Sequence, residues 1–214
     1  VWTYQSLNAA ANRLANALLA RPPSEGATVV IVAEPEINTM IAVLGCFKAQ
    51  IVFAVLDVSH SDSGLKALIE NARAELIITD HSHRCRWDRI WDGYVMDMDA
   101  PDAGAVSTNP TIRPAAQQLA YLRYTSGSTG SPKGVMETEA NIINAAIETL
   151  TWWEGLPDVR LGTLAQFWPT TTLVPLMAGL SVHPYWVRER GFAGVGPWLD
   201  AQGITVFALY TAGL

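Results

Sequence analysis

The chain has 214 residues, which is enough for one large domain or two small ones. Half of the residues are hydrophobic and 16% are charged, the opposite of the balance that keeps a chain disordered. The net charge of −6 argues against a protein whose main task is to hold nucleic-acid phosphates. The two cysteines, Cys46 and Cys85, are too few for a disulfide framework and indicate a reducing, cytoplasmic setting.

The sequence contains no recognisable membrane-spanning or targeting segment. Its longest apolar run, at 37–47, is shorter than the roughly 20 residues that a bilayer requires, so we expect no membrane association. The first residues lack the basic region and apolar stretch of a signal peptide. Because the chain starts at Val1 and is amphipathic at once, we expect that residues precede it in a longer protein.

Helical and strand patterns alternate along the chain. Apolar residues on one face predict a first helix at 7–19, with Ser6 as its N-cap. In chain order, the further predictions are a strand at 28–33, a helix at 36–48, a strand at 51–56, a helix at 62–73, strands at 76–79, 94–96 and 119–124, helices at 139–152 and 173–178, an extended segment at 181–184, a helix at 195–202 and a strand at 205–209. This alternation predicts an α/β fold of mostly parallel sheets flanked by helices.

We expect residues 1–214 to form one partial domain with an internal division. The first α/β half would cover 1–100 and the second would cover 119–214. Between them, residues 101–118 form a predicted linker, because proline, glycine and asparagine interrupt any regular pattern there.

The segment from Thr125 to Val135, TSGSTGSPKGV, carries the clearest chemistry in the chain. Glycines allow backbone N–H groups to approach a ligand and form a concave nest for phosphate oxygens. Hydroxyl side chains add donors, and a lysine adds a positive charge. We therefore predict a phosphate-binding loop with these contributing residues: Thr125, Ser126, Gly127, Ser128, Thr129, Gly130 and Lys133.

Two better-known loops of similar composition do not fit this segment. A Walker A loop needs glycine before its lysine and Ser or Thr after it, whereas Pro132 and Gly134 flank Lys133. A nucleophile elbow needs glycine two positions before its serine, and Ser126 occupies that position relative to Ser128.

The segment at 125–135 resembles the phosphate-binding signature of adenylate-forming enzymes, which include acyl-CoA synthetases, luciferases and the adenylation domains of nonribosomal peptide synthetases. The likeness continues at 2–7 (WTYQSL), 48–57 (KAQIVFAVLD), 77–80 (IITD) and 198–206. It covers the whole chain, which is most similar to the N-terminal part of a peptide-synthetase adenylation domain.

The resemblance implies that ATP, with Mg²⁺, activates a carboxylic or amino acid, and that the loop holds the β- and γ-phosphates. Lys133 would be the catalytic cation. A carrier-protein domain or coenzyme A would receive the product. The chain ends at Leu214, before the family's adenine-binding aromatic, its metal-binding Glu and its C-terminal catalytic Lys. We therefore expect it to be an incomplete enzyme, inactive without the missing C-terminal part.

Several positions depart from the family pattern. Gln50 stands where the family usually has Gly, and Glu139 stands where it usually has His, near substrate and phosphates. Phe167 and Trp168 fall at the substrate side but lack the Asp that grips an amino group. An alternative interpretation is therefore a degenerate, non-catalytic adenylation-like scaffold or binding module.

Two further clusters could hold a metal ion, but both have a simpler interpretation. The residues at 81, 83 and 85 (His, His and Cys) would share one face if they lay on a strand, as a zinc site needs, but a solvated loop is the competing interpretation. Asp97, Asp99 and Asp102 have the spacing of a loose calcium loop without its Gly and Glu, which favours a solvated linker.

The aromatic and thiol side chains complete the set of candidates. Three tryptophans near the expected substrate side either line an acid pocket or pack in a core: Trp152, Trp153 and Trp168. Cys46 lies within an apolar helical segment, so we predict a buried core thiol there.

Overall fold

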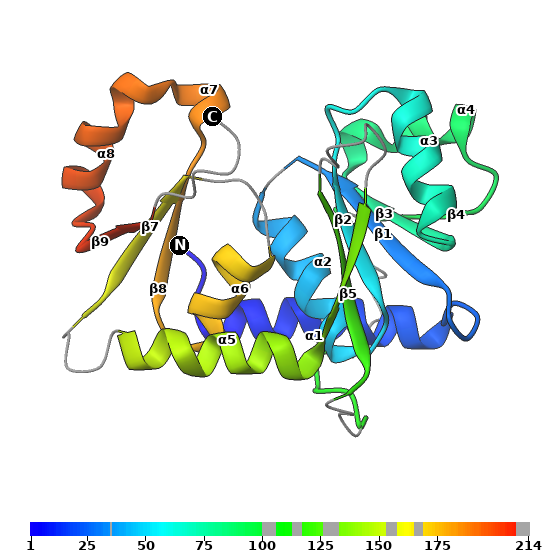
Figure 1. Cartoon of the computed structure of the whole chain (residues 1–214), viewed down its shortest axis with the longest axis horizontal. Helices are drawn as coiled ribbons and strands as arrows, with labels where there is room; N and C mark the ends of the chain where they lie inside the picture. Colours follow the sequence, from blue (N-terminus) through cyan, green and yellow to red (C-terminus); the bar gives the residue numbers. More distant parts are fainter. Residues whose placement is uncertain are drawn as a thin grey trace. The chain divides into compact units, whose positions relative to one another are not determined.

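The computed structural model describes residues 1–34, 36–99, 106–112, 117–125, 133–152, 158–164 and 169–208. The chain divides into two compact units, Val1–Glu139 and Ala140–Leu214. Both units combine helices with strands, and both sheets are wholly or mostly parallel (Figure 1). The predicted α/β fold class is therefore confirmed.

The first unit is built on a six-stranded sheet of order β4-β3-β1-β2-β5-β6. Every neighbouring pair is parallel except β5 and β6, which are antiparallel. The strands are β1 (Thr28–Ala33), β2 (Phe53–Asp57), β3 (Ala74–Thr79), β4 (Tyr94–Asp97), β5 (Leu119–Thr125) and β6 (Lys133–Thr138). The helices are α1 (Tyr4–Ala20), α2 (Ile37–Lys48), α3 (Asp62–Asn71) and α4 (Arg84–Ile90), with a 3-10 turn η1 (His81–His83) before α4.

Helix α1 begins three residues before its predicted start, because Thr3 caps it. The N–H of Ser6 donates to Thr3 Oγ1 at 3.1 Å, and the N–H of Thr3 donates to Ser6 Oγ at 3.0 Å. This reciprocal pair is a capping box, in which Ser6 is the third helical residue. The prediction of Ser6 as N-cap was therefore wrong, since the sequence offers two hydroxyls and the box uses both.

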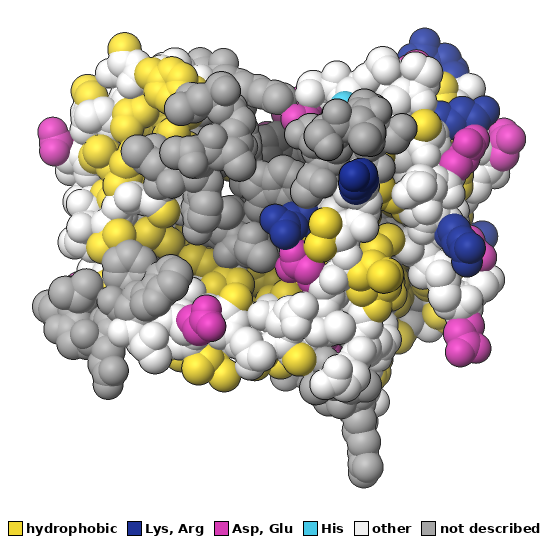
Figure 2. Space-filling model, viewed as in Figure 1, with side chains coloured by type: hydrophobic (Ala, Val, Ile, Leu, Met, Phe, Trp, Pro, Cys, Tyr) yellow, Lys and Arg dark blue, Asp and Glu magenta, His cyan; other side chains and the backbone are white. Residues whose placement is uncertain are grey.

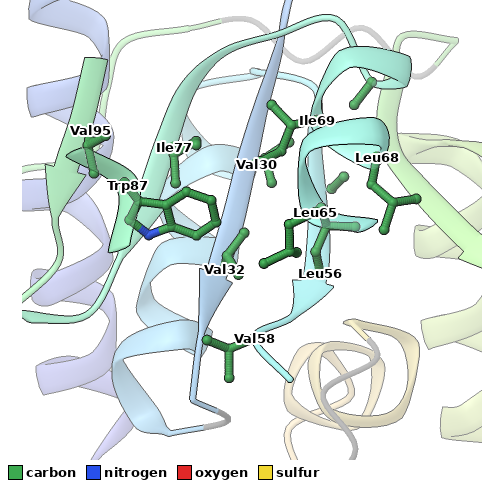
Figure 3. Packing of buried hydrophobic residues seen from close by; sticks show 12 residues of the cluster. Val30, Val32, Leu56, Val58, Leu65, Leu68, Ile69, Ile77, Trp87 and Val95 are labelled. Atoms are coloured by element: carbon green, nitrogen blue, oxygen red, sulfur yellow. The ribbon is translucent and has the colours of Figure 1, made fainter. Parts of the chain in front are cut away.

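The core of the first unit lies on both faces of β1, whose six residues are all buried. Val30 and Val32 point to the face covered by α3 and α4, where they join the cluster drawn in Figure 3. Alternate residues of a strand point to opposite faces, so Val29 and Ile31 fill the other side. The members of the cluster are Val30, Val32, Ala54, Leu56, Val58, Leu65, Leu68, Ile69, Ala72, Ile77, Trp87 and Val95.

Helix α4, which the sequence did not predict, is held to the sheet by a buried polar chain. Trp87 is fully buried, and its Nε1–H donates to Thr79 Oγ1 at 3.0 Å. Thr79 Oγ1 donates in turn to the carbonyl oxygen of Val32 at 2.8 Å. One threonine thus connects α4, β3 and β1. A helix of seven residues has too few turns for a clear periodic pattern, which explains the omission.

Helices α1 and α2 pack closely where Gly45 meets Leu14. A Cβ on Gly45 would lie 2.7 Å from Leu14 Cδ2, so a larger residue there would force the helices apart. Helix α1 also holds the described part of the predicted linker. Asn12 Nδ2 donates to the carbonyl of Ser107 at 2.8 Å, and Asn16 Nδ2 donates to that of Val106 at 2.8 Å.

The second unit contains a three-stranded parallel sheet of order β8-β7-β9. Its elements are α5 (Glu139–Trp152), which starts at the end of the first unit, then β7 (Arg160–Leu164), α6 (Pro169–Met177), β8 (Ser181–Tyr185), α7 (Val187–Arg190), η2 (Phe192–Gly194), α8 (Val195–Gln202) and β9 (Val206–Ala208). Gly162 on β7 allows α8 to approach, because a Cβ there would lie 2.9 Å from Ile204 and 3.0 Å from Trp198.

The structure divides the chain at a different point from the predicted boundary at 119. Strand β5 pairs with β2, with Tyr121 opposite Phe53 and Leu122 opposite Ala54. Strands β5 and β6 therefore complete the first sheet, and the boundary falls after Glu139. Among the described residues, no helix has the length and apolar character needed to cross a membrane.

Candidate functional site

The β5–β6 hairpin presents the segment in which the phosphate loop was predicted. Strand β5 is parallel to β2, so it ends at the carboxyl edge of the parallel strands, where open α/β sheets bind ligands. Thr125 is the last residue of β5, Lys133 is the first of β6, and the two are directly opposed. Lys133 is exposed. The predicted residues that lie outside the described ranges are Ser126, Gly127, Ser128, Thr129 and Gly130.

Tyr124 anchors the end of this hairpin to the core. Its hydroxyl donates to Asn71 Oδ1, at the end of α3, at 2.9 Å. Tyr124 and Leu122 also pack against the core cluster of Figure 3. A Cβ on Gly134 would lie 3.6 Å from the Tyr124 ring, so the ring runs alongside β6. Burial raises the pKa of the Tyr124 hydroxyl.

The opposite face of the hairpin carries an ion pair. Arg123 Nε lies 2.9 Å from Glu137 Oε1, although the N–H is not aligned for a hydrogen bond. Beside this pair the Tyr121 side chain is fully buried, and its hydroxyl has no hydrogen-bond partner among the described residues. Burial raises the pKa of Tyr121. Sequence reasoning missed Arg123 and Glu137, for which the available signal was a charge of each sign in the two strands that flank the loop.

The carboxyl ends of β1, β3 and β4 are acidic instead. A cavity of about 330 Å³ lies there, and its lining residues are Glu34, Glu36, Asn38, Thr39, Asp80, His81, Ser82, Met98 and Asp99. Asp80 accepts hydrogen bonds from the Glu34 N–H at 3.0 Å and from Ser82 Oγ at 2.5 Å. Asp99 accepts from Asn38 Nδ2 at 2.5 Å. These carboxylates secure loops and would repel a phosphate, which leaves the β5–β6 side as the better place for an anion.

Charges of both signs also alternate elsewhere on the first unit. On the face shown in Figure 2, Lys and Arg side chains of the first unit lie beside Asp and Glu side chains in several places. Arg86 is an example, because its Nε donates to Asp62 Oδ1 at 2.7 Å, and its other nitrogens donate to the carbonyls of Val58 and His60 at 2.6 Å. Arg86 thereby secures the turn that follows β2, the neighbour of β5.

The histidines considered for a zinc site lie on η1 and not on a strand, and Cys85 lies on α4. His81 Nδ1 is 2.7 Å from Asp97 Oδ2, and His83 Nδ1 is 2.6 Å from Asp80 Oδ1. The hydrogen bond and charge of Asp97 raise the pKa of His81. Within the described ranges, no group of three or more acidic, His or Cys residues could hold a metal ion.

Lys133 is the first residue of β6, whereas Glu139 follows the last residue of β6 and begins α5. The Glu139 N–H donates to the carbonyl of Gln118, just before β5 begins, at 3.1 Å. The six residues of β6 place Glu139 about 20 Å along the strand from Lys133, at about 3.3 Å per residue. Its Oε2 is buried without a hydrogen-bond partner in the described part of the chain, and burial raises the pKa of this carboxyl. Glu139 is therefore separated from Lys133 by the length of β6.

The remaining predicted residues have mixed outcomes. Cys46 is fully buried in α2, as predicted, and burial raises the pKa of its thiol. Gln50 has a φ of 54°, a left-handed conformation that favours glycine. The residues that lie outside the described ranges are Phe167 and Trp168, predicted for the substrate side, together with Trp153 and Asp102; nothing is described of the Trp152 side chain.

The sequence profile of a family described as AMP-binding enzyme matches residues 1–213. A linear gramicidin synthase protein of Brevibacillus parabrevis is 34% identical over 219 residues, which cover 98% of this chain and 3% of that protein. ATP-bound MatB from Rhodopseudomonas palustris has a TM-score of 0.76 at 26% identity, covering 86% of this chain and 39% of that one.

A third comparison shows likeness of fold alone. Fatty acyl-adenylate ligase from L. pneumophila, in complex with acyl adenylate and pyrophosphate, has a TM-score of 0.84 at 17% identity. The match covers 96% of this chain and 38% of that one. The chain thus spans much less than two thirds of the length of each of these relatives.

Proposed function

Because the chain belongs to the AMP-binding enzyme family, we propose that its β5–β6 hairpin binds the phosphates of ATP while a carboxylic acid is activated as an acyl adenylate. The observation that carries this proposal is the register of the hairpin. Thr125 and Lys133 are directly opposed at the carboxyl edge of the sheet, and they bracket seven residues rich in Ser, Thr and Gly. The anchored end of β5, with the start of β6 paired to it, would hold such a loop in a fixed position for the ligand.

In the proposed reaction, a carboxylate oxygen of the acid forms a bond to the α-phosphorus of ATP. The bond from that phosphorus to the bridging oxygen breaks, and pyrophosphate leaves with its electron pair. The backbone N–H groups of Gly127 and Gly130 and the neighbouring hydroxyls would bind the β- and γ-phosphates. Lys133 would offset the charge that grows on the departing pyrophosphate.

Magnesium enters this proposal only as the ion that accompanies ATP. Mg²⁺ at a nucleotide usually takes much of its coordination from phosphate oxygens and water, and we expect the same here. We propose a carboxylic or amino acid as substrate and a carrier-protein thiol or coenzyme A as acceptor. Support comes from the gramicidin synthase relative, which is 34% identical to this chain.

One argument for the alternative function, a non-catalytic adenylation-like scaffold, is weakened by the position of Glu139. It rested partly on Glu139, whose charge would oppose ATP if it stood beside the phosphates. The structure separates this carboxylate from Lys133 by the length of β6. Phosphate binding is therefore the function we favour for the hairpin.

Calorimetric titration of Mg-ATP into the chain tests the proposal. A charge-assisted hydrogen bond is worth about 1.5–3 kcal/mol, so Lys133→Ala should weaken binding roughly 10- to 100-fold. Lys66→Ala is a matched control, because Lys66 is an exposed lysine on α3, away from the hairpin in sequence. A folded parent chain that does not bind Mg-ATP, or equal affinities of the two variants, would contradict the proposed role of the loop.

A further inference from the structure

We propose that the Arg123–Glu137 ion pair is a positioning device, which fixes the register of β6 so that Lys133 stands opposite Thr125. This inference rests on the proposed phosphate-binding function. Arg123 and Glu137 lie outside the Ser/Thr/Gly-rich segment. Their pairing would keep Lys133 on the correct face of the sheet.

Strand β6 has little burial that could fix its register. It is the last strand of the sheet order, so β5 is its partner among the described strands. Its first four residues are all exposed, including Val135 at 38% and Met136 at 70%. A strand with one buried apolar face is pinned by that face, whereas a strand exposed on both faces slips easily.

The ion pair distinguishes the native register from its neighbours. Tyr121 is directly opposite Glu137, and Arg123 is opposite Val135, so Arg123 and Glu137 lie diagonally on one face. A slip of one residue would move Glu137 to the other face, since side chains alternate along a strand. The same slip would carry Lys133 to the opposite side, away from the face on which it now stands.

The burial of the pair strengthens this preference. The Glu137 side chain is only 13% exposed, while that of Arg123 is 40% exposed. A carboxylate with so little access to water needs a charged partner, and Arg123 Nε at 2.9 Å supplies the charge. The buried Tyr121 hydroxyl beside it has no hydrogen-bond partner among the described residues. It therefore does not favour the native register over another one.

The experiment combines two measurements on the same variants. The first is the Kd for Mg-ATP by calorimetry. The second is the set of cross-strand nuclear Overhauser contacts between Leu122 and Met136, which are opposed in the native register and lie outside the proposed phosphate loop. The variants are Glu137→Gln, Arg123→Met and the conservative Arg123→Lys. Arg89→Met is the matched control, because Arg89 is an exposed arginine on α4.

Loss of the pair should give a second set of β6 contacts and a three- to tenfold higher Kd in Glu137→Gln and Arg123→Met. Arg123→Lys should keep the native contacts and a Kd within about twofold of the parent, as should Arg89→Met. Because Glu137→Gln preserves shape, it keeps the test decisive even if Arg123→Met does not fold.

Two results would overturn the inference. One is a single native set of β6 contacts in both charge-removing variants, whatever their affinity. The other is a failure of Arg123→Lys to retain the native register. If the parent itself does not bind Mg-ATP, the proposed function fails separately, and the contacts alone then decide the role of the ion pair.

Discussion

Replacing Thr79 with valine should destabilise the first unit by removing the hydroxyl that joins three elements. Thr79 Oγ1 accepts from Trp87 Nε1–H at 3.0 Å and donates to the Val32 carbonyl at 2.8 Å. All three residues are fully buried, so water cannot replace the lost partner. Valine has nearly the same shape as threonine, and the change therefore tests the hydrogen bonds with little effect on packing.

The expected loss is dominated by the indole N–H. A buried donor without a partner costs about 1–3 kcal/mol, and the lost bond to the carbonyl adds roughly 0.5–1 kcal/mol. The extra apolar methyl of the introduced valine offsets about 1 kcal/mol of this. The net loss in the free energy of unfolding is therefore about 2 kcal/mol, which corresponds to about 4–8 °C in Tm for a chain of this size.

Urea unfolding followed by circular dichroism would measure this change. Thr79→Ser is the control, because it keeps the hydroxyl and removes one methyl group, at a cost of about 1 kcal/mol. Trp87→Phe removes the donor, so Thr79→Val should cost much less in that background. A loss below about 0.5 kcal/mol in Thr79→Val, or additivity with Trp87→Phe, would show that the Thr79 hydroxyl does not join α4 to the sheet as described.

Further tests can be made at a tightly packed glycine, at a left-handed glutamine and at a paired histidine. Gly162→Ala should lower the free energy of unfolding by about 1–3 kcal/mol, because the added Cβ has no room. Gly196→Ala should cause no such loss, since a Cβ there meets nothing within 4 Å, and thermal melting of both variants checks this. Gln50→Gly should raise Tm slightly, by relieving a left-handed φ that costs about 1 kcal/mol, and an unchanged or lower Tm would contradict this. The raised pKa of His81 means that its pairing stabilises the fold below about pH 6.5, its ordinary pKa, and that this contribution disappears as pH rises through the folded pKa. Nuclear magnetic resonance titration should show that Asp97→Asn lowers the pKa of His81; no change would remove Asp97 as the cause.

Local sequence was sufficient for several elements. Strand β1 and helix α8 have the predicted bounds, because a run of β-branched residues and a short helix ending at Gly203 are readable within one window. The buried state of Cys46 followed in the same way from its apolar helix. Helix α4 was missed, since it is too short for a pattern and depends on the contact of Trp87 with Thr79.

In the candidate site, too, some features could be recognised from the sequence and others could not. Its Ser/Thr/Gly-rich segment and its lysine are recognisable from the order of residue types alone. The pairing of Arg123 with Glu137 was not, because it requires the register of two strands. The position of Glu139 could not be predicted from the sequence either. It is close to Lys133 along the chain, but the whole length of strand β6 lies between them.

The alternation of helices and strands, the α/β class and the segment proposed to bind phosphate were all readable from the sequence, because these depend on residues adjacent in the chain. The position of β5 beside β2, which puts the end of β5 at the carboxyl edge of the first sheet, could be known only from the three-dimensional structure. Strand order is set by which buried faces pack together, and residues far apart in the sequence, such as Phe53 and Tyr121, contribute to that choice.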